Sequence, residues 1–168
     1  MKVLVSDTSV LIDLERGGFL DSCFKLPFEF AVPDILYERE LAEFGGPELV
    51  ARGLRVVELN GDEVTIAQIV RGAHPKLSLP DAFAYSLASA RKWTLLSGDG
   101  ELRALAQAQQ VTCFGVLWLL DQFFEGGVIK ATMIATGLES IAAHPRCRLP
   151  KAEIQARLER YRGRTRLD

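Results

Sequence analysis

Short apolar runs alternate with helical segments along the first two thirds of this chain, and no other sequence feature restricts its fold as strongly. Strand-like runs occur at 3–5, 28–32, 54–59, 94–97 and 111–114, and each precedes a segment with helical periodicity. Parallel neighbours in a sheet need a crossover connection, which a helix usually supplies. The alternation therefore predicts an α/β fold with a parallel sheet of about five strands, covered by helices on both faces.

The pattern changes near Gly115, after which only helical segments follow, at 116–124, 130–143 and 151–161. We therefore divide the chain into an α/β domain at residues 1–114 and a C-terminal helical extension at residues 115–168, packed on or beside it. The extension begins with more apolar side chains than one short helix usually buries, which predicts a homodimer. These side chains are Val116, Leu117, Trp118, Leu119, Leu120, Phe123 and Phe124.

Charge and composition exclude several classes of protein. The formal net charge of −2 argues against a protein that coats nucleic acid by bulk electrostatics. Residues 146–168 are basic, which is more typical of a solvated helix end than of an RNA-binding arm, although the charge also suits RNA. Three cysteines without C-x-x-C spacing, no signal-peptide pattern and no long apolar stretch indicate a cytoplasmic protein with no membrane association.

Acidic residues follow two of the expected strands directly. Asp7 comes after the first strand and Asp99 after the fourth. In an open parallel sheet the ligand site lies beyond the carboxyl ends of the strands, so both carboxylates should reach the same edge. Asp81, and either Glu38 or Glu40, would complete the cluster from helices that begin or end near that edge. The sequence thus predicts four acids around one pocket.

Carboxylates that converge in this way need a counter-charge. Two of them about 5 Å apart repel by roughly 3 kcal/mol at an effective dielectric of about 20. A divalent cation offsets that repulsion, and oxygen-only ligands suit Mg²⁺ or Mn²⁺ rather than zinc. Such an ion activates water and offsets charge on a phosphate, so we expect hydrolysis of phosphodiester bonds.

Each acid also has a structural interpretation. Asp7 could cap the helix that follows it, Asp81 could form a capping box with Ser78, and Asp99 lies in a Gly-Asp-Gly turn. The glutamates could form a solvated helix face. The metal hypothesis therefore depends on the whole set meeting in space.

The ordered motifs resemble those of the PIN-domain nucleases. The matching segments are residues 3–12 around Asp7, Val32-Pro33 through Glu40-Leu41, residues 79–82 around Asp81, and residues 95–99 ending at Asp99. Each motif is short, and their order and spacing give the resemblance its specificity. It covers about residues 1–114, which would then form the PIN-like nuclease domain.

The resemblance implies a Rossmann-like α/β/α sandwich and a metal-dependent endoribonuclease that cuts single-stranded RNA with Mg²⁺ or Mn²⁺. By position, Asp7, Asp81 and Asp99 match the first, third and fourth acids of the family, and Thr8 and Ser97 are hydroxyl neighbours that could orient ligands. Counting from Asp34 makes Glu40 the second acid, and we prefer it. Counting from Pro33 favours Glu38 and leaves that choice open.

Many PIN-domain proteins are toxins of toxin–antitoxin pairs, so the resemblance also implies an antitoxin protein as a possible partner. The alternative from a different class is a non-catalytic PIN-like domain that binds or acts as a scaffold.

Overall fold

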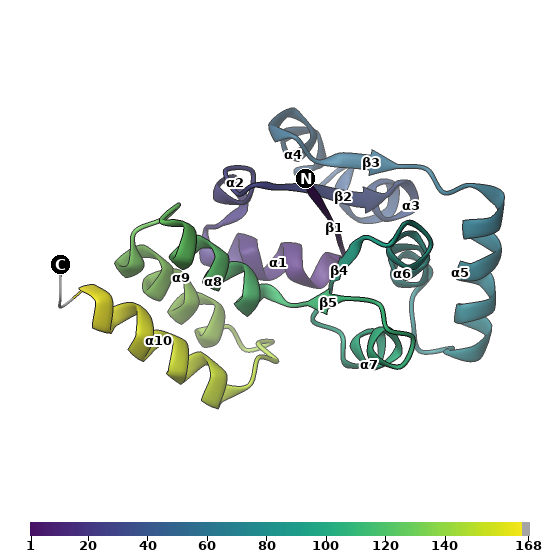
Figure 1. Ribbon diagram of the computed structural model, residues 1–168. Coiled ribbons are helices and arrows are strands. Elements are labelled where there is room, and N and C mark those ends of the chain that lie inside the picture. The colour runs from purple at the N-terminus through teal and green to yellow at the C-terminus, as the bar shows by residue number, and fades with distance from the viewer. Residues whose placement is uncertain (166–168) are drawn as a thin grey trace.

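The computed structural model describes residues 1–165 and contains one parallel sheet between layers of helices (Figure 1). The strands stand in the order β3-β2-β1-β4-β5, and every neighbouring pair is parallel. Their bounds are β1 Lys2–Ser6, β2 Phe28–Pro33, β3 Arg55–Val57, β4 Thr94–Leu96 and β5 Cys113–Phe114. The predicted fold class, a Rossmann-like sandwich with five parallel strands, is confirmed.

Helices connect the strands and continue beyond the last one. They are α1 Thr8–Gly17, α2 Leu20–Cys23, α3 Asp34–Leu36, the π-helical turn η1 Tyr37–Leu41, α4 Gly46–Arg52, α5 Gly61–Ala73, α6 Leu79–Arg91, α7 Gly100–Ala108, α8 Val116–Gly126, α9 Ala131–Ala143 and α10 Lys151–Thr165. The sequence did not predict α2 or α4. The single helical segment expected after the second strand is instead a short α turn followed by the π turn, and Phe44 beyond that turn is 76% exposed.

Alternation along the strands divides the apolar residues between two cores, because successive side chains of a strand point to opposite faces. Leu4 and Leu96 face the core that also contains α1 and the C-terminal helices. Val5 and Leu95 face the core beneath α6 and α7. All four side chains are fully buried, as expected for central strands of a sheet covered on both sides.

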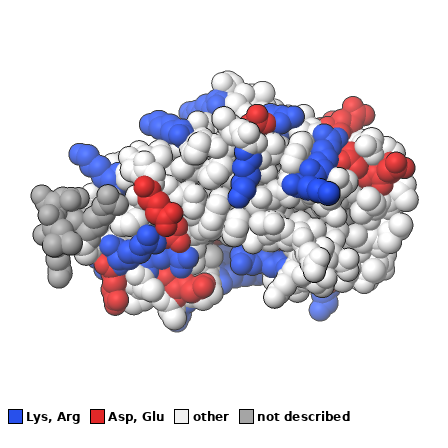
Figure 2. Space-filling model, in the orientation of Figure 1, with Lys and Arg blue, Asp and Glu red and all other residues white. Residues whose placement is uncertain are grey.

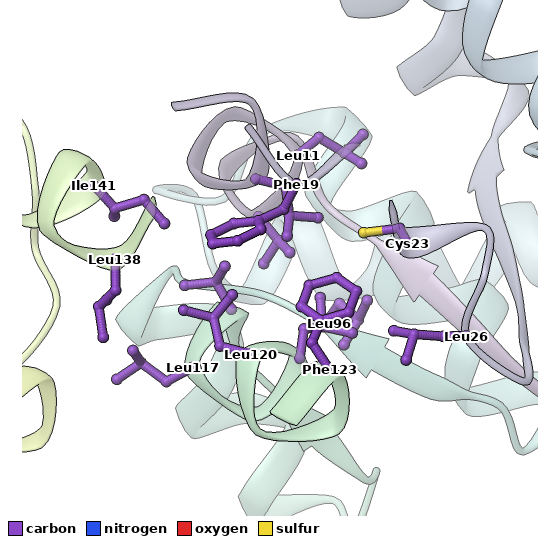
Figure 3. Packing of buried hydrophobic residues seen from close by; sticks show 14 of the residues in the cluster. Leu11, Phe19, Cys23, Leu26, Leu96, Leu117, Leu120, Phe123, Leu138 and Ile141 are labelled. Atoms are coloured by element: carbon purple, nitrogen blue, oxygen red, sulfur yellow. The ribbon is translucent and has the colours of Figure 1, made fainter. Parts of the chain in front are cut away.

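Helices α8 and α9 complete the first of these cores. Figure 3 shows Leu117, Leu120 and Phe123 of α8 packed among Phe19 and Leu96 of the α/β part. The apolar side chains of α8 are buried within this chain, apart from the half-buried Trp118, so α8 does not present the apolar face from which we expected a dimer. The dimer stays a prediction without that support.

Ion pairs and hydrogen bonds hold α10 against α8 and α9. Asp121 of α8 accepts hydrogen bonds from Arg157 Nη2 at 2.9 Å and from Tyr161 Oη at 2.6 Å, and Arg162 pairs with Glu139 of α9. Basic and acidic side chains accordingly lie side by side at the left of Figure 2, over the C-terminal helices. Arg157, Arg160 and Arg162 of the basic run thus form ion pairs within the protein, while Arg166 of that run lies outside the described residues. Within residues 1–165, no helix is long and apolar enough to cross a membrane.

Candidate active site

The sheet topology brings Asp7 next to the end of β4. Strands β1 and β4 are neighbours, with Ser6 paired to Leu96, so the residues that follow them leave the sheet together. The backbone N–H of Asp7 donates a hydrogen bond to the carbonyl of Leu96 at 2.9 Å. Asp7 and Asp99 therefore lie at the same edge of the sheet, as expected for residues that follow the carboxyl ends of parallel strands.

Three donors hold the carboxylate of Asp7, which is 2% exposed. Ser97 Oγ donates to Oδ2 at 2.5 Å, while Ser9 Oγ and the backbone N–H of Val10 donate to Oδ1 at 2.7 and 3.0 Å. The Val10 bond makes Asp7 the N-cap of α1. Burial nevertheless raises the pKa of Asp7 to about 6, because the hydrogen bonds offset only part of the desolvation and the charge of Asp81 adds to it.

Asp81 lies in the first turn of α6, which packs against β1, β2 and β4. Its backbone N–H donates to Ser78 Oγ at 3.2 Å, so the capping interaction considered for this pair is present. Burial raises the pKa of Asp81, and the nearby charge of Asp99 raises it further. Asp81 is thus within electrostatic reach of both Asp7 and Asp99.

The π turn decides which glutamate faces these acids. The N–H of Ala42 donates to the carbonyl of Tyr37 five residues earlier, at 2.8 Å. Glu40 is half-buried, and its atom Oε2 is buried without a hydrogen-bond partner among the described residues, whereas Glu38 is exposed. Burial raises the pKa of Glu40, and the charge of Asp81 raises it further. Of the two candidates, Glu40 is the one that lies with the aspartates.

Asp99 is the N-cap of α7. Its Oδ1 accepts from the N–H of Leu102 at 2.9 Å, and its own N–H donates to Ser97 Oγ at 3.0 Å. Ser97 therefore contacts the carboxylate of one acid and the backbone of another. The cap roles of Asp7, Asp81 and Asp99 do not exclude a second role, because an ionised carboxylate offers about four lone-pair sites.

The four acids form an electrostatically coupled cluster rather than a finished coordination sphere. Asp81 is the member that links the others electrostatically, since its charge interacts with those of Asp7, Glu40 and Asp99. In the described part of the chain, no three acidic, histidine or cysteine side chains lie close enough together to ligate one ion as they stand. The cluster is therefore acidic and partly desolvated, with its carboxylates still apart.

Two hydroxyl groups complete the surroundings. Thr8 Oγ1 is buried and has no hydrogen-bond partner among residues 1–165. Ser9, which the sequence analysis did not single out, donates to Asp7 and accepts from the N–H of Gly98 at 3.1 Å. It thereby joins the loops after β1 and β4. A hydroxyl two residues after a capping aspartate is a local signal that could have identified it.

Comparison with known families agrees with this geometry. A family model described as a PIN domain matches residues 3–162, so the chain belongs to the PIN-domain family. PIN domains are generally nucleases that use divalent metals. The match extends through α8 and α9 and into α10, beyond the boundary expected at residue 114, and that boundary stays a prediction. A search of curated proteins finds no significant match.

Proposed function

We propose that this protein is a metal-dependent endoribonuclease that hydrolyses phosphodiester bonds of single-stranded RNA. The observation that carries the proposal is the coupled set of acids at the carboxyl end of the sheet, in which Glu40 Oε2 is buried without a partner. Burial and mutual repulsion both raise the pKa of Asp7, Asp81 and Glu40. Perturbed carboxyl groups gathered at one place are typical of functional sites.

The residues present fit Mg²⁺ or Mn²⁺. Both ions prefer oxygen ligands, and Mg²⁺ usually keeps several waters and takes one or two carboxylates directly from the protein. The cluster can therefore serve such an ion without three converging ligands. We assign Asp7, Glu40, Asp81 and Asp99 as the residues that would hold the metal, directly or through water. When bound, the ion would supply an acidified water molecule and positive charge beside the phosphate.

The protein's own groups would orient the reaction. Ser97 and Ser9 fix the Asp7 carboxylate in one rotamer and favour its charged form, which is the form that binds a cation. Thr8 offers a free hydroxyl for a phosphate oxygen or a bound water. The acids repel the RNA backbone on their own, so a bound cation should strengthen the binding of RNA at this edge of the sheet.

RNA as the substrate and a toxin role rest on the family, and the cytoplasm as the location rests on the three cysteines, which form no disulfide within the described residues. We propose that the protein acts as a toxin restrained by an antitoxin that places a basic side chain in the acidic pocket. Growth inhibition on expression, relieved by Asp7→Asn or by co-expression of a small neighbouring protein, is the expected result. Expression without any effect on growth would remove the toxin role while leaving the nuclease proposal intact.

Cleavage of RNA tests the nuclease proposal directly. Purified protein with Mn²⁺ should cut varied single-stranded RNA, and a chelator or Asp81→Asn should abolish the cutting. Asp62→Asn is the matched control, because Asp62 also lies in the first turn of a helix, α5, but is exposed and takes no part in the cluster. Intact RNA under all metal conditions, or equal cleavage by Asp81→Asn, would contradict the proposal.

The separation of the carboxylates favours one alternative, a non-catalytic PIN-like domain that binds RNA or acts as a scaffold. Calorimetry separates the two functions. A catalytic domain should take up Mn²⁺ with an affinity that falls in Asp81→Asn, whereas a scaffold domain should give no heat that depends on this residue.

A further inference from the structure

A cavity of about 460 Å³ opens beside the acidic cluster, within the size range usual for ligand pockets. It lies where the loop after β4 meets the first turns of α8 and α10. The residues that matter for its chemistry are Gly98, Arg103, Gly115, Trp118, Arg148 and Arg157, and we call it the arginine cavity. Gly98 stands between Ser97 and Asp99, so the cavity adjoins the candidate active site directly.

Arg103 connects the cavity to the acids. Its Nη1 donates to the carbonyl oxygen of Ser97 at 3.2 Å, and the hydroxyl of the same serine binds Asp7. Gly115 makes room for this guanidinium, because a Cβ atom built there would lie 2.7 Å from Arg103 Nη1. The remaining N–H groups of Arg103 are free to bind an anion, since the side chain is exposed and makes no ion pair within residues 1–165.

Arg148 is the second available cation of the cavity. It is exposed and has no ion-pair partner in the described chain, whereas Arg157 is already bound to Asp121. Of the acids that line the cavity, Asp13 pairs with Arg16 at 3.6 Å, and Glu153 is exposed to solvent. Two guanidinium groups thus remain for a ligand that carries negative charge.

The rest of the cavity wall suits a nucleotide. Gly115, the N-cap of α8, has no side chain to bind the first N–H groups of that helix, so these amides add to the favourable field for an anion. Trp118 and Leu149 supply apolar surface, and Trp118 is held in place by stacking on Phe114 with ring centroids 4.3 Å apart. Cationic donors beside a fixed aromatic group are typical of sites that bind single-stranded nucleic acid.

We propose that the arginine cavity binds a nucleotide of the RNA strand next to the phosphate that is cut, with its phosphate on Arg103 and Arg148 and its base against Trp118 and Leu149. This assignment rests on the proposed nuclease function and extends it, because it makes the C-terminal helices part of the substrate site. The cavity would then hold the strand in register while the acids act on the neighbouring phosphate.

Binding without cleavage tests the proposal. The probe is a short fluorescein-labelled single-stranded oligoribonucleotide of mixed sequence, titrated by anisotropy in the presence of a chelator. Arg103→Gln and Arg148→Gln should each weaken binding about 3- to 10-fold, and each should reduce the salt slope of log K by about 0.7. Arg71→Gln on α5 is the matched control, because it removes an exposed arginine from a helix remote from the cavity.

Gly115→Ala gives a second test that leaves every charge in place. Since its Cβ atom would displace the tip of the Arg103 side chain but leave its charge, it should weaken binding by less than Arg103→Gln and leave the salt slope unchanged, with native circular dichroism. Unchanged affinity and salt slope in both arginine variants, or no binding of the probe by the unmodified protein, would overturn the proposal. If the arginine variants bind the probe more weakly but no metal supports cleavage, the cavity assignment stands and the nuclease function fails. Metal-supported cleavage with unchanged affinity in the arginine variants would support the nuclease function and overturn the cavity assignment.

Discussion

The Oγ atom of Ser97 donates a hydrogen bond to Oδ2 of Asp7 across 2.5 Å, although 90 positions separate the two residues. The contact exists because β1 and β4 are neighbours and end at the same level. It stabilises a carboxylate that has lost nearly all its contact with water. The protein therefore maintains a charge at a place where burial opposes it, and this charge should affect both stability and activity.

Asp7→Asn should stabilise the protein at neutral pH while abolishing activity. Burial raises the pKa of Asp7 from 3.8 to about 6, so between these values the folded state binds more protons than the unfolded state. The free energy of unfolding should fall as pH rises through this window, by an amount on the order of 3 kcal/mol. Urea unfolding across the window should show this fall in the unmodified protein and its loss in Asp7→Asn. A variant less stable than the parent at pH 7 would contradict the prediction.

Glu40→Gln and Glu38→Gln should differ sharply in their effect on cleavage. Glu40 lies with the acids and Glu38 is exposed, although both belong to the same turn. We expect Glu40→Gln to lower the rate of RNA cleavage by about a hundredfold or more, and Glu38→Gln to change it less than about twofold. The comparison is made on one RNA under single-turnover conditions. Equal losses in the two variants would mean that the π turn does not select the second acid.

Divalent cations should raise the melting temperature. A ligand present at about a hundred times its dissociation constant stabilises the folded state by about 2.7 kcal/mol, which corresponds to several degrees in a chain of this size. Differential scanning fluorimetry with Mg²⁺ or Mn²⁺ at pH 7 should show the increase, and Asp81→Asn should reduce it. The increase should be smaller below pH 6, where Asp7 is largely protonated. Sodium chloride at matched ionic strength is the control.

Gly137→Ala and Gly72→Ala should change stability in opposite directions. Alanine usually stabilises a helix by about 1 kcal/mol relative to glycine. At Gly137 in α9, however, the new Cβ atom would lie 2.2 Å from Cζ of Phe19 and 2.6 Å from the carbonyl oxygen of Gly17. We expect a loss of about 1–3 kcal/mol there. Gly72 in α5 has open space around it and should give the usual gain. Chemical denaturation measures both, and a gain at Gly137 would show that α9 can move away from α1.

The sequence was informative about the sheet and the aspartates because both depend on local signals. A β-branched run that stops at an acid predicts the end of a strand, and Ser78 ahead of Asp81 predicts the start of a helix. Parallel topology then brings the residues after β1 and β4 to one edge, whatever the details of packing. The positions of Asp7, Asp81 and Asp99 follow from these steps.

The second acid could not be fixed in this way. On a regular helix with 3.6 residues per turn, Glu38 and Glu40 point in nearly opposite directions, so only one of them can face the aspartates, and a change of one residue in the turn decides which. The π turn at Tyr37–Leu41 adds one residue to the helical turn, and no sequence signal predicted it. The role of α8 was hidden for a related reason. Its apolar side chains indicate that it is buried, but periodicity does not identify the surface that covers it.

Helices α8, α9 and α10 share one continuous core with β1 and β4. A fragment ending near residue 114 would expose to water much of the core that α1 and the central strands share with these helices, and the isolated helices would lose the partner of their apolar faces. Folding should then be cooperative over the full length, with a single unfolding transition seen by every probe. In physical terms the last third of the chain completes the hydrophobic core on one face of the sheet, so its removal should lower the stability of the whole fold.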